Sequence, residues 1–157
     1  MYNRILLPTD GTAGMDEVVR HAVALAETHD AEIHALYVAD TGRFSTLPAD
    51  MTWEGVTELF QTEGERAIDA VERLAGDVPV ERAIVDGRPS TRIGEYASTH
   101  DCDVIVMGTH GRAGIDRLLL GSVAETVIRG SRIPVVTVPV GATSPEPPAQ
   151  PREIAIE

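Results

Sequence analysis

Short apolar runs alternate with amphipathic stretches through the first 140 residues of the chain. The run at 5–7, closed by Pro8 and a polar turn at 9–12, indicates a buried strand and a loop. From Met15, apolar residues recur at helical spacing, with Asp16 and Glu17 in the first turn, where the helix dipole favours acids. The same patterns predict strands at 33–38, 80–85, 103–108 and 134–138, and helices around 56–74, 89–100 and 122–130.

This strict alternation of strand and helix predicts an α/β fold with five parallel strands. Parallel neighbours need right-handed helical crossovers, so helices are expected on both faces of the sheet. In such open sheets, ligands bind at the carboxyl ends of strands where the winding direction switches. The loops after the first and fourth strands are therefore the places to look for chemistry.

The loop after the fourth strand carries glycines at a distinctive spacing. After Gly108 and Gly111, nine residues intervene before Gly121 and Ser122, which open a helix. Glycines permit close approach of a ligand to the backbone, and a helix N-terminus offers free N–H groups to an anion. Ser122 could cap that helix or give its hydroxyl to a phosphate. The whole pattern favours a polyphosphate cradle over a loop that merely ends in a capped helix.

Local charge agrees with a phosphate site. Residues 108–132 hold four arginines and two acidic residues, a charge of +2, whereas the remaining nine arginines and 23 acidic residues give −14. Two familiar phosphate motifs are excluded: GxxxxGK[ST] requires lysine, which the chain lacks, and no GxGxxG follows the first strand.

Length, composition and charge narrow the possible classes of protein. The 157 residues suit one domain at 1–140, and the Pro-rich segment 141–157 is expected to be a mobile tail. With no signal-peptide layout and no membrane-length apolar run, we expect a cytoplasmic protein without membrane contact. A net charge of −12 argues against nucleic-acid binding. The absence of lysine favours a halophilic cytosol over an ordinary acidic protein, because concentrated salt screens repulsion between surface acids.

With this glycine pattern and order of elements, the chain resembles a universal stress protein of the nucleotide-binding type. The family pattern G-x2-G-x9-G-[ST] is met by Gly108, Gly111, Gly121 and Ser122. The opening strand with 8–10 and the closing strand at 134–138 are also similar to the family, and the likeness covers about residues 1–140. It implies a Rossmann-like sheet of strand order 3-2-1-4-5, binding of ATP (or AMP or ADP), and a homodimer paired through the fifth strands.

The resemblance also implies a set of nucleotide-binding positions. Asp10 would lie near the adenosine or a nucleotide-bound Mg²⁺ or Mn²⁺, and the backbone of Val38 would contact the adenine. The ribose would lie between Met107 and Gly108. Phosphates would be held at Gly111, Gly121, Ser122 and Val123, with His110 close by, Arg112 either at the phosphates or in solvent, and Pro8 and Thr9 leading into Asp10.

Several other residues could suggest a functional site, but we expect them to have structural roles. The run His100, Asp101, Cys102 and Asp103 looks like a metal cluster, but it spans a helix end and a strand start, so we expect Cys102 to be a buried core residue. Trp53, Phe60 and Tyr96 are expected to pack in the core. Gly64 is expected to be a weak point in its helix.

Three functions remain open from the sequence. The first is an ATP-binding stress-response regulator that acts on an unidentified protein partner. The second is a slow ATPase or nucleotidyl-transfer enzyme on the same fold, which would need acid, base or metal-binding groups around Asp10. The third is a structural dimer with a vestigial pocket. No catalytic residue is assigned.

Overall fold

The computed structural model describes residues 1–109 and 120–140, which form a five-stranded parallel sheet with four α-helices. The strand order is β3-β2-β1-β4-β5, so the predicted fold class and strand order are confirmed. The predicted tail at 141–157 and the loop positions His110, Gly111 and Arg112 lie outside the described residues. In chain order the elements are β1 Arg4–Pro8, α1 Met15–His29, β2 Glu32–Asp40, the 3-10 helix η1 Thr41–Thr46, α2 Trp53–Ala75, β3 Val80–Gly87, α3 Pro89–Thr99, β4 Val104–Gly108, α4 Ser122–Gly130 and β5 Val135–Val138.

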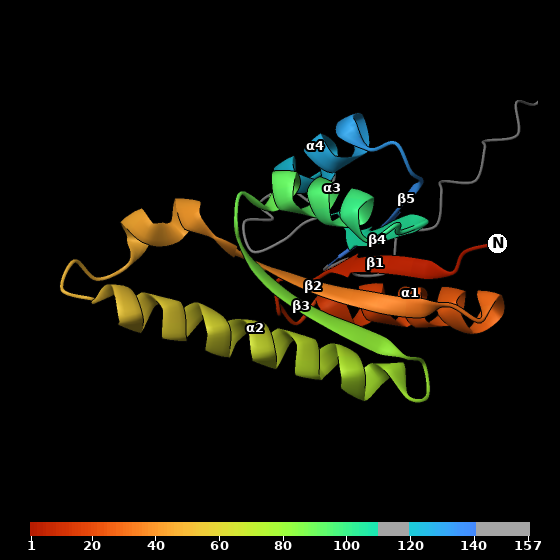
Figure 1. Cartoon of the computed structure of the whole chain (residues 1–157), viewed down its shortest axis with the longest axis horizontal. Helices are drawn as coiled ribbons and strands as arrows, with labels where there is room; N and C mark the ends of the chain where they lie inside the picture. The colour runs from red at the N-terminus through yellow and green to blue at the C-terminus, as the bar shows by residue number, and fades with distance from the viewer. Residues whose placement is uncertain (110–119, 141–157) are drawn as a thin grey trace, which may run out of the picture.

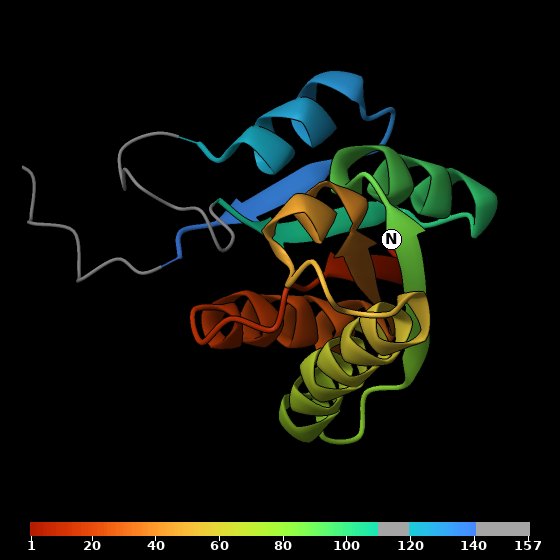
Figure 2. The same ribbon diagram turned by 90° about the vertical axis from the view of Figure 1, so that its left-hand side faces the viewer.

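The helices cover the sheet in two layers. Helices α1 and α2 lie on one face and α3 and α4 on the other, as the end-on view shows (Figure 2). Alternate residues of β2 therefore enter different cores: Tyr37 joins the core under α1 and α2, and Leu36 joins the core under α3 and α4. Strand β1 lies at the centre of the sheet, and its residues Ile5, Leu6 and Leu7 have no exposed surface (Figure 1).

Helix α2 approaches the sheet most closely at Gly64. A Cβ at this position would lie 2.8 Å from Cδ1 of Tyr37 and 3.1 Å from Cδ1 of Ile84. The Tyr37 ring is buried, and its hydroxyl donates a 2.8 Å hydrogen bond to Glu63, so the ring has little room to move. The expectation that Gly64 merely weakens the helix was therefore incomplete, because the glycine is what lets α2 rest on β2 and β3.

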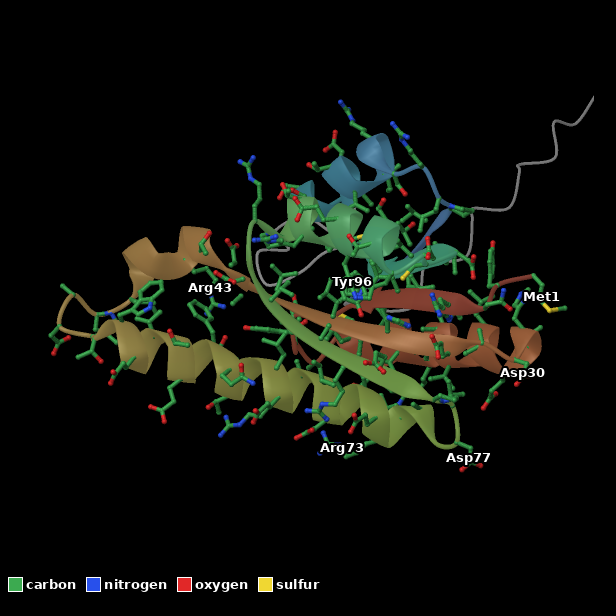
Figure 3. All side chains as sticks on the ribbon, viewed as in Figure 1. Met1, Asp30, Arg43, Arg73, Asp77 and Tyr96 are labelled. Carbon is green, nitrogen blue, oxygen red and sulfur yellow. The ribbon has the colours of Figure 1, made fainter. Side chains whose placement is uncertain are left out.

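The aromatic residues divide between core and surface. Phe60 and Tyr96 are buried, as expected from their spacing. Trp53 was expected to pack in the core, but 70% of it is exposed. It is the first residue of α2, before the helix comes over the sheet, so the helical period of its neighbours did not apply to it. Arg43 reaches from η1 to α2, where its guanidinium lies over the Phe60 ring and pairs with Glu63 at 3.3 Å (Figure 3).

Within the described residues, the longest helix, α2, combines its apolar face with a charged one, and no helix has the length and apolarity needed to span a bilayer.

We predict that Gly64→Ala destabilises the protein although alanine is the better helix former. The added methyl group has to displace the Tyr37 ring, and such overpacking costs about 1–3 kcal/mol. Gly94→Ala in α3 is the matched control, since a Cβ there meets no atom within 4 Å. That control should raise the free energy of unfolding by up to about 1 kcal/mol. Urea unfolding of both variants checks the claim, and a stabilised Gly64→Ala protein would contradict it.

Candidate nucleotide-binding site at the carboxyl edge of the sheet

The first and fourth strands end side by side at the carboxyl edge of the sheet. Strand β1 pairs with β4 in the register Ile5 to Val104 and Leu6 to Ile105. The same offset, continued, brings Pro8, the last residue of β1, level with Met107, one residue before β4 ends at Gly108. From β1 the chain winds toward β2 and β3, whereas β4 and β5 lie on the other side, so this edge is the switch point.

A tight turn follows β1 and fixes the position of Asp10. One carboxylate oxygen of Asp10 accepts hydrogen bonds from the backbone N–H and the hydroxyl of Thr12, at 3.0 and 2.7 Å. Gly11 has a positive φ of 76°, and a Cβ on it would lie 3.1 Å from Cβ of Ala67 in α2. Glycine is therefore required at this turn for conformation and for space. Asp10 therefore stabilises the turn through its own side chain, and the turn in return holds the carboxylate at the switch point.

Strand β2 extends beyond the end of β1 and carries Val38 to the open side of the site. The backbone N–H of Thr9 donates to the carbonyl of Leu36 at 2.9 Å, the last contact between these strands. Residues two apart on a strand direct their backbone groups to the same neighbour, so Val38 faces the space that β1 has vacated. Its side chain packs instead in the core under α3 and α4. A planar base could therefore meet the Val38 backbone without meeting its side chain.

The start of α4 is tied back to the end of β4. Thr109 donates its backbone N–H to the carbonyl of Val138 at 3.0 Å, and Gly121 donates its N–H to the carbonyl of Thr109 at 2.6 Å. The residues on either side of the intervening loop are therefore joined by a hydrogen bond, and the N-terminus of α4 lies beside the end of β4. This bond brings Gly108 and Gly121, which are 13 positions apart in the sequence, to the same edge.

Among the described residues, no side chain caps the N-terminus of α4. Gly121 is the N-cap, so the possibility that Ser122 is the cap is not what the structure adopts. The first intrahelical bond runs from the N–H of Glu125 to the carbonyl of Gly121, and the preceding N–H groups have no partner within the helix. Ser122 is exposed at the first helical position, with its hydroxyl available to a ligand.

The described arginines that contribute to the positive charge of residues 108–132 do not lie beside the glycines at the start of α4. Arg129 pairs with Glu125 at 2.8 Å along α4, and Arg132 follows the far end of that helix. Both lie about a helix length from Ser122, and the other two arginines, Arg112 and Arg117, fall outside the described residues. Within the described part, the positive character of the site comes from the helix dipole and backbone N–H groups, not from these two guanidinium groups.

The donor set at Asp10 fits a metal only together with a nucleotide. The described residues contain no group of three or more His, Cys, Asp or Glu side chains that could hold an ion. Mg²⁺ usually binds one or two carboxylates together with substrate phosphates and waters. Asp10 could supply such a carboxylate, and the phosphates would supply the remaining oxygens.

The run from His100 to Asp103 has the structural roles expected of it. Cys102 is buried, and burial raises the pKa of its thiol to about 11. Asp103 accepts hydrogen bonds from the backbone N–H groups of Asn3 and Arg4, at 2.7 and 2.9 Å, and these bonds lower the pKa of its carboxyl. The segment fastens the start of β4 to the start of β1.

A chain of hydrogen-bonded polar side chains around buried His34, toward the opposite edge of the sheet, was not foreseen. His34 is buried in β2, with its Nδ1 2.9 Å from the Tyr96 hydroxyl and its Nε2 2.9 Å from Glu32 (Figure 3). Glu32 accepts a further bond from Arg4 and has a lowered pKa, mainly through its hydrogen bond with His34. In sequence, His34 is a lone polar residue inside an apolar strand, and only strand pairing brings its partners to it. The chain lies at the amino ends of the strands, away from the switch point.

Comparison with known proteins agrees with this fold. The chain matches the universal stress protein family over residues 1–139. It is 41% identical over 140 residues to a universal stress protein of Methanocaldococcus jannaschii, a match that covers 88% of this chain and 82% of that relative. The chain therefore belongs to the universal stress protein family, and the resemblance inferred from its glycine spacing is confirmed.

Two solved structures extend the comparison. A second universal stress protein of Methanocaldococcus jannaschii has a structure with a TM-score of 0.74 and 30% identity, covering 91% of this chain and 99% of that one. The structure of a universal stress protein in complex with cAMP has a TM-score of 0.60 and 25% identity, covering 87% of this chain and 96% of that one. The fold is thus shared with a relative that holds an adenine nucleotide.

We predict that Asp103→Asn destabilises the protein at neutral pH by under about 1 kcal/mol, because a partly exposed charged acceptor contributes modestly. The pKa of Asp103 is lower in the folded state, so its contribution is present above the unfolded value of 3.8 and is lost as pH falls through the folded value. Urea titrations between pH 7 and pH 3 should therefore show the two proteins converging in acid. Asp101→Asn is the control, because Asp101 has a positive φ that asparagine also adopts. A constant difference at every pH would contradict the assignment.

Proposed function

We propose that this protein binds ATP at the carboxyl edge of the sheet and acts as a nucleotide-dependent regulator in a stress response. The observation that carries the proposal is the Gly121–Thr109 bond, which holds an uncapped helix N-terminus against the end of β4. An unfilled helix N-terminus is a natural site for phosphate. The relative solved with cAMP supports an adenine nucleotide as the ligand class.

The proposed arrangement of ATP follows from the order of groups along this edge. The phosphates lie at Gly121, Ser122 and Val123, where the first N–H groups of α4 have no partner within the helix. Gly111, the other phosphate position that the family resemblance implies, lies outside the described residues. The ribose lies over the end of β4 at Met107 and Gly108. The adenine meets the backbone of Val38, which extends past the end of β1. Asp10, held by Thr12 and reached through Pro8 and Thr9, faces the adenosine or the metal carried by the phosphates.

A regulator is favoured over an efficient enzyme because the site is built from backbone donors. Such donors bind a phosphate before and after any reaction, and differential binding of the transition state is what accelerates a chemical step. Asp10 is already fixed by two bonds from Thr12, which suits a positioning role. A change in nucleotide occupancy could instead alter the loop after β4 and the surface around it, and so the affinity for a protein partner.

We predict that Gly121→Val weakens ATP binding by at least about tenfold, or about 1.4 kcal/mol. Gly121 has a φ of −62° and a ψ of 154°, which valine adopts without strain, so the variant tests bulk and not backbone conformation. Gly130→Val, at the other end of α4, is the matched control, because a Cβ there meets no atom within 4 Å.

Calorimetry with MgATP should be run in dilute buffer and in molar KCl, because the net charge of −12 opposes an anionic ligand when unscreened. Unchanged affinity in a folded Gly121→Val protein would show that the phosphates lie elsewhere. Phosphate release measured on the same samples separates the functions. Binding without turnover supports a regulator, turnover supports an ATPase, and no binding supports a vestigial pocket.

We also expect a homodimer paired through β5. This strand is the edge of the sheet beside β4, and Val136 on it is 37% exposed. An open apolar edge invites further strand pairing, and a two-fold axis lets two copies close each other's edges. Val136→Arg should yield monomers in light scattering, whereas Ile128→Arg, which alters an exposed apolar residue of α4, should not. A native protein that is monomeric at every concentration would contradict this proposal.

A further inference from the structure

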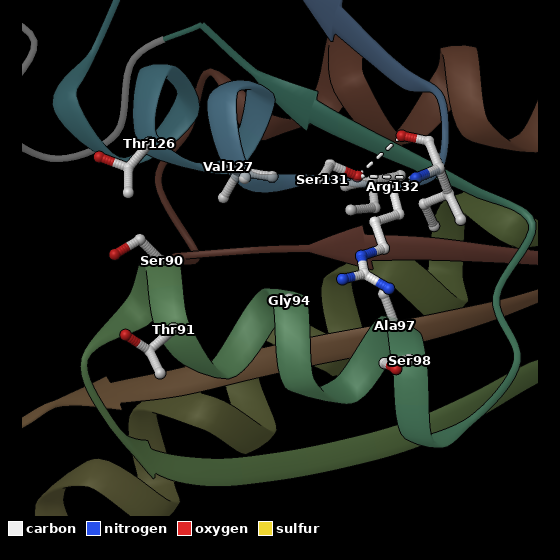
Figure 4. A pocket seen from close by; sticks show the side chains of 12 residues that line it. Ser90, Thr91, Gly94, Ala97, Ser98, Thr126, Val127, Ser131 and Arg132 are labelled. Atoms are coloured by element: carbon white, nitrogen blue, oxygen red, sulfur yellow. Dashed lines mark hydrogen bonds between the residues drawn. The ribbon is translucent and has the colours of Figure 1, made fainter.

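A cavity lies between α3 and α4, on the face of the sheet that these two helices cover. Its volume is about 450 Å³, within the range of cavities that hold small organic ligands. None of the residues that line it belongs to the positions proposed for the nucleotide. It runs along α3 from Ser90 to Ser98, a length of about 12 Å at the rise of an α-helix (Figure 4).

The cavity is apolar in the middle and polar at its ends. Ala97, Ile105, Val127 and Ile133 contribute apolar walls. Ser90 and Thr91 lie at one end, and Ser98 and Arg132 at the other (Figure 4). A ligand that fits this pattern is elongated and has an apolar body with a polar group at its head.

The glycine in the middle of α3 keeps the cavity open. Gly94 lines the space, and a Cβ built on it would meet no atom within 4 Å. Helix packing therefore does not require glycine here, in contrast to Gly64, and alanine would make the better helix. The chain keeps the poorer helix former at a position where any side chain would enter the cavity.

Arg132 supplies a cation at one end of the cavity. Its side chain extends from the α4–β5 connection into the space between the two helices, toward Ala97 (Figure 4). Among the described residues, its guanidinium has no carboxylate within ion-pair distance, whereas Arg92 pairs with Glu95 and Arg129 with Glu125. A guanidinium matches the geometry of a carboxylate through two parallel N–H donors.

We propose that the cavity between α3 and α4 binds a small monocarboxylate with an aliphatic body, its carboxylate at Arg132 and Ser98 and its chain over Gly94. The apolar walls remove the chain from water, and the hydroxyl groups and guanidinium satisfy the carboxylate oxygens. This site is independent of nucleotide binding. It would give the protein a second ligand on the helix whose N-terminus is proposed to hold the phosphates.

Octanoate is the probe. Butyrate, which keeps the carboxylate but has a much shorter chain, and octan-1-ol, which keeps the chain but has no charge, are the comparison ligands. Calorimetry on the full chain, together with methyl NMR shifts of Ile105, Val127 and Ile133, should show saturable octanoate binding. Butyrate and octan-1-ol should each bind at least about tenfold more weakly, which corresponds to about 1.4 kcal/mol. Arg132→Gln should weaken octanoate to the level of octan-1-ol and leave octan-1-ol unchanged. Arg129→Gln, which removes an exposed arginine paired with Glu125, is the matched control and should change neither.

Gly94→Leu should abolish binding of both octanoate and octan-1-ol by filling the cavity, and Gly94→Ala should weaken both while folding at least as well as the native chain. If Gly94→Leu does not fold, Arg132→Gln and Gly94→Ala still decide the question. Octanoate binding that is unchanged in both would overturn the proposal. So would an absence of saturable binding at about 1 mM octanoate, or methyl shifts confined to residues elsewhere.

Discussion

The architecture depends on the burial of β1 between β2 and β4 in the middle of a parallel sheet. Every backbone group of such a strand has to be paired, and helices have to cover both of its faces. The chain meets these requirements by winding one way from β1 to β3 and the other way from β4 to β5. The reversal leaves the carboxyl ends of β1 and β4 side by side, which is where open sheets of this kind bind their ligands.

Helix α2 links the core to this edge. It rests on β2 and β3 at Gly64, and one turn further on Ala67 touches the space that a side chain at Gly11 would need. The turn that presents Asp10 is therefore shaped by a helix more than 50 residues away in sequence. Two glycines, each placed where a methyl group would collide with a buried neighbour, make the helix packing and the turn compatible.

Charge acts on this protein at two scales. The net charge of −12 repels anions at long range, and most ion pairs among the described residues lie on the exposed surface, where each contributes little. The proposed site would attract an anion locally instead, through the N–H groups at the start of α4 that have no partner within the helix. Arg132, at the other end of α4, faces the cavity between the helices, so the two ends of one helix present positive groups to two separate spaces.

The sequence alone determined the elements, because the burial periodicity of strands and helices is written directly in the order of apolar residues. It also located the glycines at both ends of the β4–α4 loop, since their spacing is a local property, and the family likeness supplied the strand order. Only the tertiary structure decided which side chains met. It gave Gly121 and not Ser122 the N-cap position, exposed Trp53 and gave Gly64 a packing role. It also assembled the hydrogen-bonded chain of Glu32, buried His34 and Tyr96. These features depend on contacts between residues distant in sequence, and the cavity between α3 and α4 depends on the distance between two helices, which no periodicity along the chain encodes.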